Sequence, residues 1–204
     1  MKYVIMAILI ILALNILPKE HSKMSTLLPK DTILAVGDSL TYGHGASHDE
    51  SYPSLLASLS GQKVINAGIN GDTSDGGVQR LPALLEDKST TLMILCFGGN
   101  DIMQRKSMSS LKQNLKTMIQ MAKAKNIEVL LISIPNFTLF GLSPLELYEE
   151  VAEEENIPLL SGILANILSQ PALKSDQIHP NALGYKEMSE LIYESLKENG
   201  WVGK

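Results

Sequence analysis

Apolar, strand-like runs alternate with helical patterns along the chain from Asp31 onward, and this alternation limits the possible folds more than any other feature. Short apolar runs bounded by turn residues are typical of buried strands. The runs are Thr32–Val36, Lys63–Asn66, Leu92–Phe97, Glu128–Ile134 and the shorter Ile157–Leu160. Strands that alternate with helices favour a parallel sheet covered on both faces. We therefore predict an α/β protein with a three-layer α/β/α sandwich.

Between these runs, apolar residues recur at three- and four-residue steps, which is typical of helices with one buried face. The clearest such segment is Ser107–Lys125. The other segments are Ser51–Leu59, Ser74–Glu86, Pro144–Asn156, Ile163–Leu168 and Ala182–Glu198. A chain of 204 residues suits one domain with a sizeable core.

The N-terminal segment differs from the rest of the chain. Its apolar run from Val4 to Leu17 contains a single polar residue, Asn15, and a lysine precedes it. A membrane-spanning helix needs about 20 apolar residues, so the run fits an export signal better. No small-x-small cleavage pattern follows it, so a cleaved signal and a retained membrane anchor both stay open. We expect residues 1–30 to be signal or anchor plus linker, residues 31–204 to be the folded domain, and the protein to be exported to the periplasm or secreted.

Charge and cysteine content exclude several classes of function. The net charge of −5 argues against a nucleic-acid partner. Cys96 is the only cysteine, which excludes an intrachain disulfide, and its place in a predicted strand indicates a core residue. Histidines and carboxylates do not cluster with metal-ligand spacing, so we predict no metal and no cofactor. We interpret His44 and His48 as solvated loop histidines, with a contact to substrate as the alternative.

Four polar, glycine-rich blocks follow predicted strands or precede a predicted helix. They are "GDS" at Gly37-Asp38-Ser39, "NAGINGDTSDGG" after the second strand, "GGND" after the third, and "SDQIHPNALGY" near the C-terminus. The carboxyl ends of parallel strands meet at one edge of a sheet, where open α/β sheets bind their ligands. The four blocks are therefore expected to line one cleft.

The residue types in these blocks fit nucleophilic catalysis by serine. A serine hydroxyl needs a base, and the base needs a partner that fixes its tautomer. His179 can be the base for Ser39, and Asp176 can orient His179. Three residues separate this pair, so a helical turn would place both side chains on one face. Pro180 would then fit the first turn of the following helix.

Acyl transfer also needs hydrogen-bond donors directed at the oxyanion. The backbone N–H groups of Gly71 and Ser39 and the side-chain amide of Asn100 can supply them. Less specific interpretations exist as well. Ser39 and Asn100 could cap helices, and Gly71 could serve a turn. Asp176 and His179 could be a surface pair that caps a helix N-terminus. We expect Asp38 to brace the turn, because a carboxylate beside the nucleophile would oppose the oxyanion.

The four blocks, "GDSL", "NGDTS", "GGND" and "DQIHPN", resemble those of the SGNH (GDSL) hydrolases in order and approximate spacing. The resemblance covers Asp31 to about Leu196, and it looks closest to the bacterial exported thioesterases, lysophospholipases and arylesterases. It implies a flavodoxin-like sheet of about five parallel strands in the order 2-1-3-4-5. The implied triad is Ser39, Asp176 and His179, and the implied oxyanion hole is Ser39, Gly71 and Asn100.

We therefore expect a serine esterase that hydrolyses small-molecule acyl esters or thioesters through an acyl-enzyme. A carbohydrate or cell-wall O-acetyl esterase is the alternative, and a non-catalytic binding domain is disfavoured because no required residue is missing. The segments Asp101–Ser109 and Asn136–Pro144 are expected to set the substrate. Phe137, Leu139, Phe140 and Leu142 could form an acyl-binding wall or pack beneath their loop.

Overall fold

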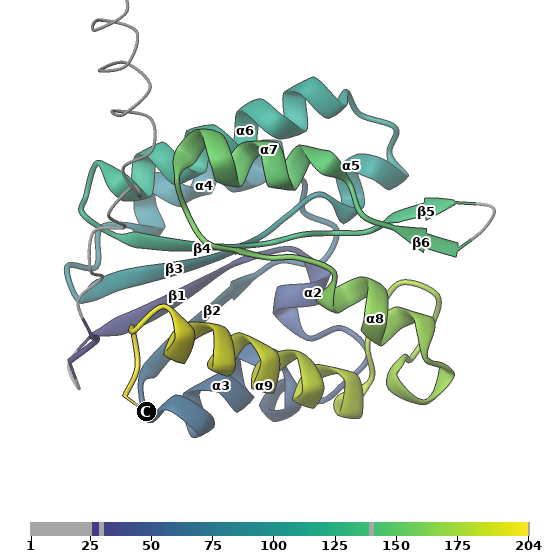
Figure 1. Cartoon of the computed structure of the whole chain (residues 1–204). Helices are drawn as coiled ribbons and strands as arrows, with labels where there is room; N and C mark the ends of the chain where they lie inside the picture. The colour runs from purple at the N-terminus through teal and green to yellow at the C-terminus, as the bar shows by residue number, and fades with distance from the viewer. Residues whose placement is uncertain (1–25, 29–30, 139–140, 204) are drawn as a thin grey trace, which may run out of the picture.

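The structure is a computed structural model that describes residues 26–28, 31–138 and 141–203 (Figure 1). The apolar run from Val4 to Leu17 lies outside the described residues. Within the described ranges, every helix is too short or too polar to cross a membrane.

Five parallel strands form the central sheet, in the order β2-β1-β3-β4-β7. The strands are β1 Thr32–Gly37, β2 Lys63–Gly68, β3 Thr90–Cys96, β4 Glu128–Ile132 and β7 Leu159–Leu160. Each overlaps one of the predicted apolar runs, and the predicted order 2-1-3-4-5 is confirmed. Because β2 and β3 lie on opposite sides of β1, the chain changes direction at β1 and opens a crevice at the carboxyl edge of the sheet.

Helices cover both faces of the sheet, as Figure 1 shows, so the three-layer prediction is confirmed. One face carries α3 Tyr52–Ser60 and α9 Ala182–Glu198. The other carries α4 Ser74–Leu84, α6 Met108–Lys123 and α7 Glu146–Glu155. The three central strands β1, β3 and β4 are mostly buried, and Ile33 to Val36 of β1 are at most 1% exposed.

Short elements occupy the segments between the main strands and helices. They are α2 Ser39–Tyr42, α5 Gly99–Met103, α8 Ile163–Ser169, and the 3-10 turns His48–Glu50 and Pro171–Leu173. The segment expected to set the substrate includes a small antiparallel hairpin of β5 Asn136–Thr138 and β6 Gly141–Ser143, which projects beside the carboxyl edge of the sheet (Figure 1). Except for α8, these elements are too short to show a period in the sequence.

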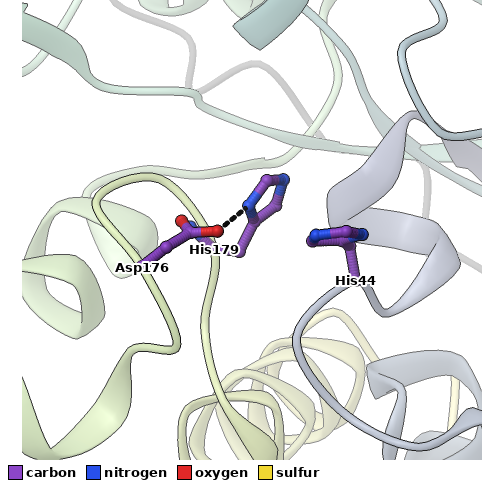
Figure 2. A group of neighbouring side chains, drawn as sticks. All are labelled: His44, Asp176 and His179. Atoms are coloured by element: carbon purple, nitrogen blue, oxygen red, sulfur yellow. Dashed lines mark hydrogen bonds and ion pairs between the residues drawn. The ribbon is translucent and has the colours of Figure 1, made fainter.

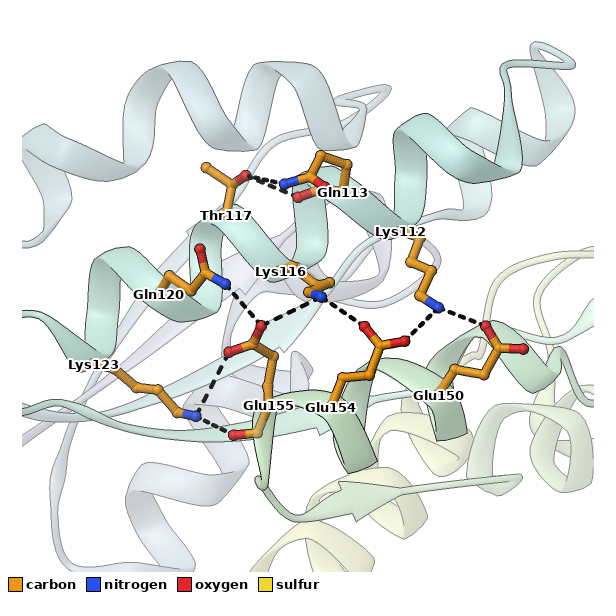
Figure 3. Close-up of polar contacts among 9 residues, drawn as sticks. All are labelled: Lys112, Gln113, Lys116, Thr117, Gln120, Lys123, Glu150, Glu154 and Glu155. Carbon is orange, nitrogen blue, oxygen red and sulfur yellow. Dashed lines mark hydrogen bonds and ion pairs between the residues drawn. The ribbon is translucent and has the colours of Figure 1, made fainter.

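The amphipathic helix α6 packs on the sheet through one face and pairs with α7 through another. Its buried face consists of Leu111, Leu115, Met118, Ile119 and Ala122. On the exposed side, the Lys112 ammonium contacts Glu150 at 2.7 Å and Glu154 at 2.8 Å, and Lys116 contacts Glu154 at 2.6 Å (Figure 3). The buried face contributes most of the helix packing, because exposed ion pairs add little stability.

The folded body includes residues on the N-terminal side of the boundary expected at residue 31. The Leu27 N–H donates to the Trp201 carbonyl oxygen at 2.6 Å, and the Thr26 hydroxyl donates to Gly200 O at 3.0 Å. The Leu27 side chain is 9% exposed and belongs to the core. Residues 26–28 therefore pack against the C-terminal end of the chain.

Candidate active site

Ser39 is the first residue of α2, immediately after β1. Gly37 allows this abrupt transition: a Cβ at Gly37 would lie 2.1 Å from Thr41 Oγ1, so only glycine fits. Asp38 caps α2, since its Oδ1 accepts a hydrogen bond from Leu40 N at 3.0 Å. The turn thus holds the partly exposed Ser39 hydroxyl at the carboxyl edge of the sheet.

The structure brings Ser39, His179 and Asp176 into one hydrogen-bonded line. His179 Nε2 lies 3.0 Å from Ser39 Oγ, and His179 Nδ1 lies 2.8 Å from Asp176 Oδ2 (Figure 2 shows the latter pair). An ionised carboxylate can only accept hydrogen bonds, so Nδ1 carries the ring proton and Nε2 can accept from the serine hydroxyl. This tautomer is the one that a general base for Ser39 requires.

Asp176 and His179 lie in a turn that the Asp176 carboxylate closes. Asp176 Oδ1 accepts hydrogen bonds from Ile178 N at 2.8 Å and from His179 N at 2.9 Å. The expected helical turn is therefore wrong, although the two side chains do meet. Pro180 also lies outside the helix, because Asn181 is the N-cap of α9 and accepts from Gly184 N at 3.1 Å.

Asp176 stays ionised in this turn. Partial burial raises the pKa of its carboxyl, but hydrogen bonds from the Ile178 N–H, the His179 ring and the His179 N–H outweigh this effect and lower the pKa overall. A charged Asp176 can hold the His179 ring in place and stabilise the imidazolium that forms when the ring takes a proton.

Asn100 lines the same pocket as Ser39, lies in α5, and is 7% exposed. Its Nδ2 donates to Asp72 O at 2.8 Å and, at 3.2 Å, to Asp38 Oδ2. Gly71 directly precedes Asp72 and has a φ of +77°, which favours glycine. Asn100 therefore links the Gly71 turn to the residue that precedes the nucleophile.

Two sets of contacts that the sequence did not reveal surround the Gly71–Asp72 turn, one partly buried and one buried. Arg80 Nε contacts Asp72 Oδ2 at 2.8 Å, and Arg80 Nη2 donates to Gly37 O at 2.9 Å. Asp101 accepts from Ser74 N at 3.0 Å and from Ser74 Oγ at 2.6 Å. Through these contacts, Asp72 and Asp101 connect the segments that follow β1, β2 and β3.

Asp38 is 1% exposed, and burial raises the pKa of its carboxyl to about 7. The hydrogen bonds from Leu40 and Asn100 favour the charged form, but they do not offset the burial. At neutral pH a large fraction of Asp38 is therefore uncharged. This reduces the negative charge beside Ser39, which supports the expectation that Asp38 braces the turn.

A pocket of about 360 Å³, open to solvent, is bounded by Ser39, Asn100 and His179. Its apolar lining residues are Leu40, Met103, Ile134, Pro135, Leu168 and Ile178. Gly71 is not among the lining residues. Met103 lies in one of the two segments expected to set the substrate, but Leu142 from the other is absent from the lining. The side chains of Phe137, Leu139 and Phe140 lie outside the described part of the structure.

A serine, an imidazole and a carboxylate joined at the carboxyl edge of a parallel sheet define a serine hydrolase with a flavodoxin-like sheet. The chain belongs to the GDSL-like lipase/acylhydrolase family, whose pattern it matches over residues 35–187. This confirms the family resemblance in the sequence.

Named relatives of known sequence and structure agree with this assignment. The chain is 33% identical to esterase TesA of Pseudomonas aeruginosa, over 81% of this chain and 88% of that protein. It is 35% identical to thioesterase 1/protease 1/lysophospholipase L1 of Escherichia coli K12, over 74% and 76% respectively. A crystal structure of TesA superposes with a TM-score of 0.75 at 32% identity, covering 83% of this chain and 99% of that one.

Proposed function

We propose that this protein hydrolyses carboxylic acyl esters or thioesters of small molecules through an acyl-enzyme, with Ser39 as nucleophile, His179 as base and Asp176 as the group that orients His179. The observation that carries the proposal is the 3.0 Å separation of His179 Nε2 and Ser39 Oγ at the edge of an apolar pocket. At that distance a proton can pass directly from the hydroxyl to the ring. Relatives named as esterase and thioesterase support the same reaction class.

The proposed first step forms the acyl-enzyme. His179 Nε2 takes the hydroxyl proton as Ser39 Oγ attacks the carbonyl carbon, and the carbonyl oxygen becomes an oxyanion. When this intermediate collapses, the imidazolium returns the proton to the departing alcohol or thiol. A water molecule then repeats the sequence, with His179 again as base, and releases the acid.

The oxyanion would be stabilised by the N–H groups of Ser39 and Gly71 and by the amide of Asn100. The hydrogen bond from Asn100 to Asp38 is long, at 3.2 Å, so the developing oxyanion can compete for that hydrogen. The shorter bond to Asp72 O, at 2.8 Å, keeps the amide in place. Because Asp38 is about half protonated near pH 7, it opposes the oxyanion less than a fully charged carboxylate would.

The pocket favours a medium acyl chain over an acetyl group. Its lining next to Ser39 is mostly apolar, as is typical of pockets that bind apolar groups. An acetyl group would leave much of this apolar surface in contact with water. We therefore propose acyl esters or thioesters of medium length as substrates rather than acetylated sugars.

Hydrolysis of p-nitrophenyl esters from acetate to dodecanoate, and of matching acyl thioesters, tests this function. We expect kcat/KM to peak between butyrate and octanoate, and Ser39→Ala to abolish turnover. Ser58→Ala, an exposed serine on α3, is the matched control and should behave as wild type. A fluorophosphonate should label wild type at Ser39, as seen by peptide mass spectrometry. Equal inertness of wild type and Ser39→Ala on all esters would refute the proposal, and a peak at acetate would favour the deacetylase.

We also propose that the protein is exported. The support is the apolar run from Val4 to Leu17 together with the lysine before it. Mass spectrometry of the N-terminus, on protein from the native host, distinguishes the two forms. A new N-terminus after Leu17 indicates a cleaved signal, and an intact one in the membrane fraction indicates an anchor. An intact N-terminus in the cytoplasmic fraction would contradict export.

A further inference from the structure

His44 lies beside His179, although the two residues come from distant parts of the chain. Their ring centroids are 4.4 Å apart, with 50° between the ring planes, and Figure 2 shows both rings beside Asp176. The backbone of His44 is fixed from two directions: its N–H donates to Ser39 O at 3.0 Å, and its carbonyl accepts from the Tyr185 hydroxyl at 2.8 Å. The fold thus holds an exposed imidazole next to Asp176 and His179.

These three side chains can present metal ligands to a common point. One ligand atom from each of His44, Asp176 and His179 lies within 4.8 Å of the other two. Asp176 Oδ1 is occupied by two backbone N–H groups, which leaves Oδ2 directed at the imidazole. Imidazole nitrogens with a carboxylate oxygen are the donor set that Zn²⁺, Ni²⁺ and Cu²⁺ prefer.

The distances suit a metal after a small rearrangement. Zinc bonds of about 2.0–2.2 Å place tetrahedral ligands about 3.4 Å apart. A pair at the 4.8 Å limit must therefore close by about 1.4 Å, and the 2.8 Å pair of Asp176 Oδ2 and His179 Nδ1 must open by about 0.6 Å. His44 can supply the closing movement because its side chain is exposed. Within the described part of the chain, its ring nitrogens make no hydrogen bond. Three protein ligands would leave a fourth position for water.

We propose that His44, Asp176 and His179 form an inhibitory site for a transition-metal dication, and that Zn²⁺ is the principal metal bound there. A metal on His179 Nδ1 uses the lone pair of that nitrogen, so the ring proton moves from Nδ1 to Nε2. Nε2 then donates a hydrogen bond instead of accepting one, and Ser39 loses its base. The metal also takes Asp176 Oδ2 away from the ring. The inhibition rests on the proposed function, but the binding of the metal does not.

This site was not visible in the sequence. His44 and the Asp176–His179 turn are separated by most of the domain, so no ligand spacing marks them. The residues meet because the loop after α2 and the turn before α9 both lie at the carboxyl edge of the sheet. The proposal therefore replaces the expectation of no metal site with a site that regulates rather than catalyses.

The first experiment measures inhibition. The full chain is treated with EDTA, dialysed and assayed with a p-nitrophenyl ester at increasing ZnCl₂. We expect Zn²⁺ to inhibit wild type, and His44→Gln to raise the half-inhibitory concentration about tenfold or more, as loss of a group that supports a metal site does. His48→Gln, an exposed histidine of the same loop outside the cluster, is the matched control and should be inhibited like wild type. MgCl₂ should not inhibit, because Mg²⁺ prefers oxygen ligands.

The second experiment measures binding without turnover. Calorimetric titration of ZnCl₂ into Ser39→Ala should show one site, and the Ser39→Ala/His44→Gln double variant should lose that heat. This result would support the site even if the esters tested were not substrates. Equal inhibition of wild type and His44→Gln, the same heat in both calorimetric samples, or a loss of activity on EDTA treatment that Zn²⁺ restores would each overturn the proposal.

Discussion

Asp38 and Asp176 both lie near Ser39, and their surroundings shift the pKa values of the two carboxyls in opposite directions. Asp38 is 1% exposed, and burial raises its pKa to about 7. The Asp176 side chain is 46% exposed, and hydrogen bonds from its own turn lower its pKa. Two identical side chains near one hydroxyl therefore carry different charges at neutral pH.

This difference separates the roles that the two carboxylates can take in acyl transfer. A charged Asp176 stabilises a positive imidazolium, and an Asp38 that is about half protonated near pH 7 repels a negative oxyanion less than a fully charged carboxylate would. Asn100 connects Asp38 to the proposed oxyanion hole, since its amide contacts Asp38 and Asp72 O. Substituting Asp176, Asp38 and Asn100 one at a time should therefore change different measurable properties.

Removing the charge of Asp176 should have the largest effect. In Asp176→Asn the amide NH₂ would face His179 Nδ1, so the ring would carry its proton on Nε2 and could not accept one from Ser39. We expect kcat to fall on the order of 10⁴-fold with little change in KM or in the circular dichroism spectrum. A decrease smaller than tenfold would show that Asp176 does not set the tautomer.

Removing the ionisable group at Asp38 should change how stability depends on pH. The pKa in the folded state, about 7, lies above the ordinary value of 3.8, so the folded state favours the protonated form. The stabilisation is complete below about pH 4 and is lost as the pH rises to about 7, by about 4 kcal/mol at most.

Urea unfolding of wild type and Asp38→Asn at several pH values measures this effect. Asparagine does not titrate, so the stability of wild type relative to the variant should decrease from pH 4 to pH 8. Other groups titrate equally in both proteins and cancel in the difference. A difference that stays constant over this range would mean that Asp38 is an ordinary, charged carboxylate.

Asn100→Ala tests the link between Asp38 and the proposed oxyanion hole. It removes one proposed oxyanion donor, and we expect kcat to fall by about 10²–10³-fold, or about 3 kcal/mol of transition-state stabilisation. KM should change little, because the donor acts mainly on the intermediate. An unchanged kcat would show that the amide only supports the Asp72 turn.

The sequence predicted the sheet because each of its strands forms a separate apolar run followed by a turn. The sequence placed Ser39, Asp176 and His179 together, and hydrogen bonds do join them, while their catalytic roles remain a proposal. The helical turn expected for Asp176 and His179 was wrong, however. A turn closed by backbone N–H groups and a helical turn both bring residues three apart together, and spacing alone does not distinguish them.

Interactions between segments distant in sequence could not be predicted. Arg80 of α4 donates to Gly37 O, and His44 contacts His179, because segments far apart in the sequence meet at one sheet edge. The apolar lining near Leu168 and Ile178 depends on the same assembly. Single residues of this kind carry no period or local motif, so their role appears only when the fold is known.

The ion pairs between α6 and α7 lie far from the proposed active site. We expect substitutions there to have the smallest effect on stability and none on activity. Hydrogen bonds from Lys112 and Lys116 lower the pKa of Glu154 to about 2, yet the two lysines are partly exposed, Glu154 is exposed, and solvent screens the pairs. Lys112→Ala should lower Tm by about 2 °C or less and leave kcat unchanged. The difference should disappear in 1 M salt. A larger loss that persists in salt would mean that the Lys112 side chain stabilises α6 by packing rather than by charge.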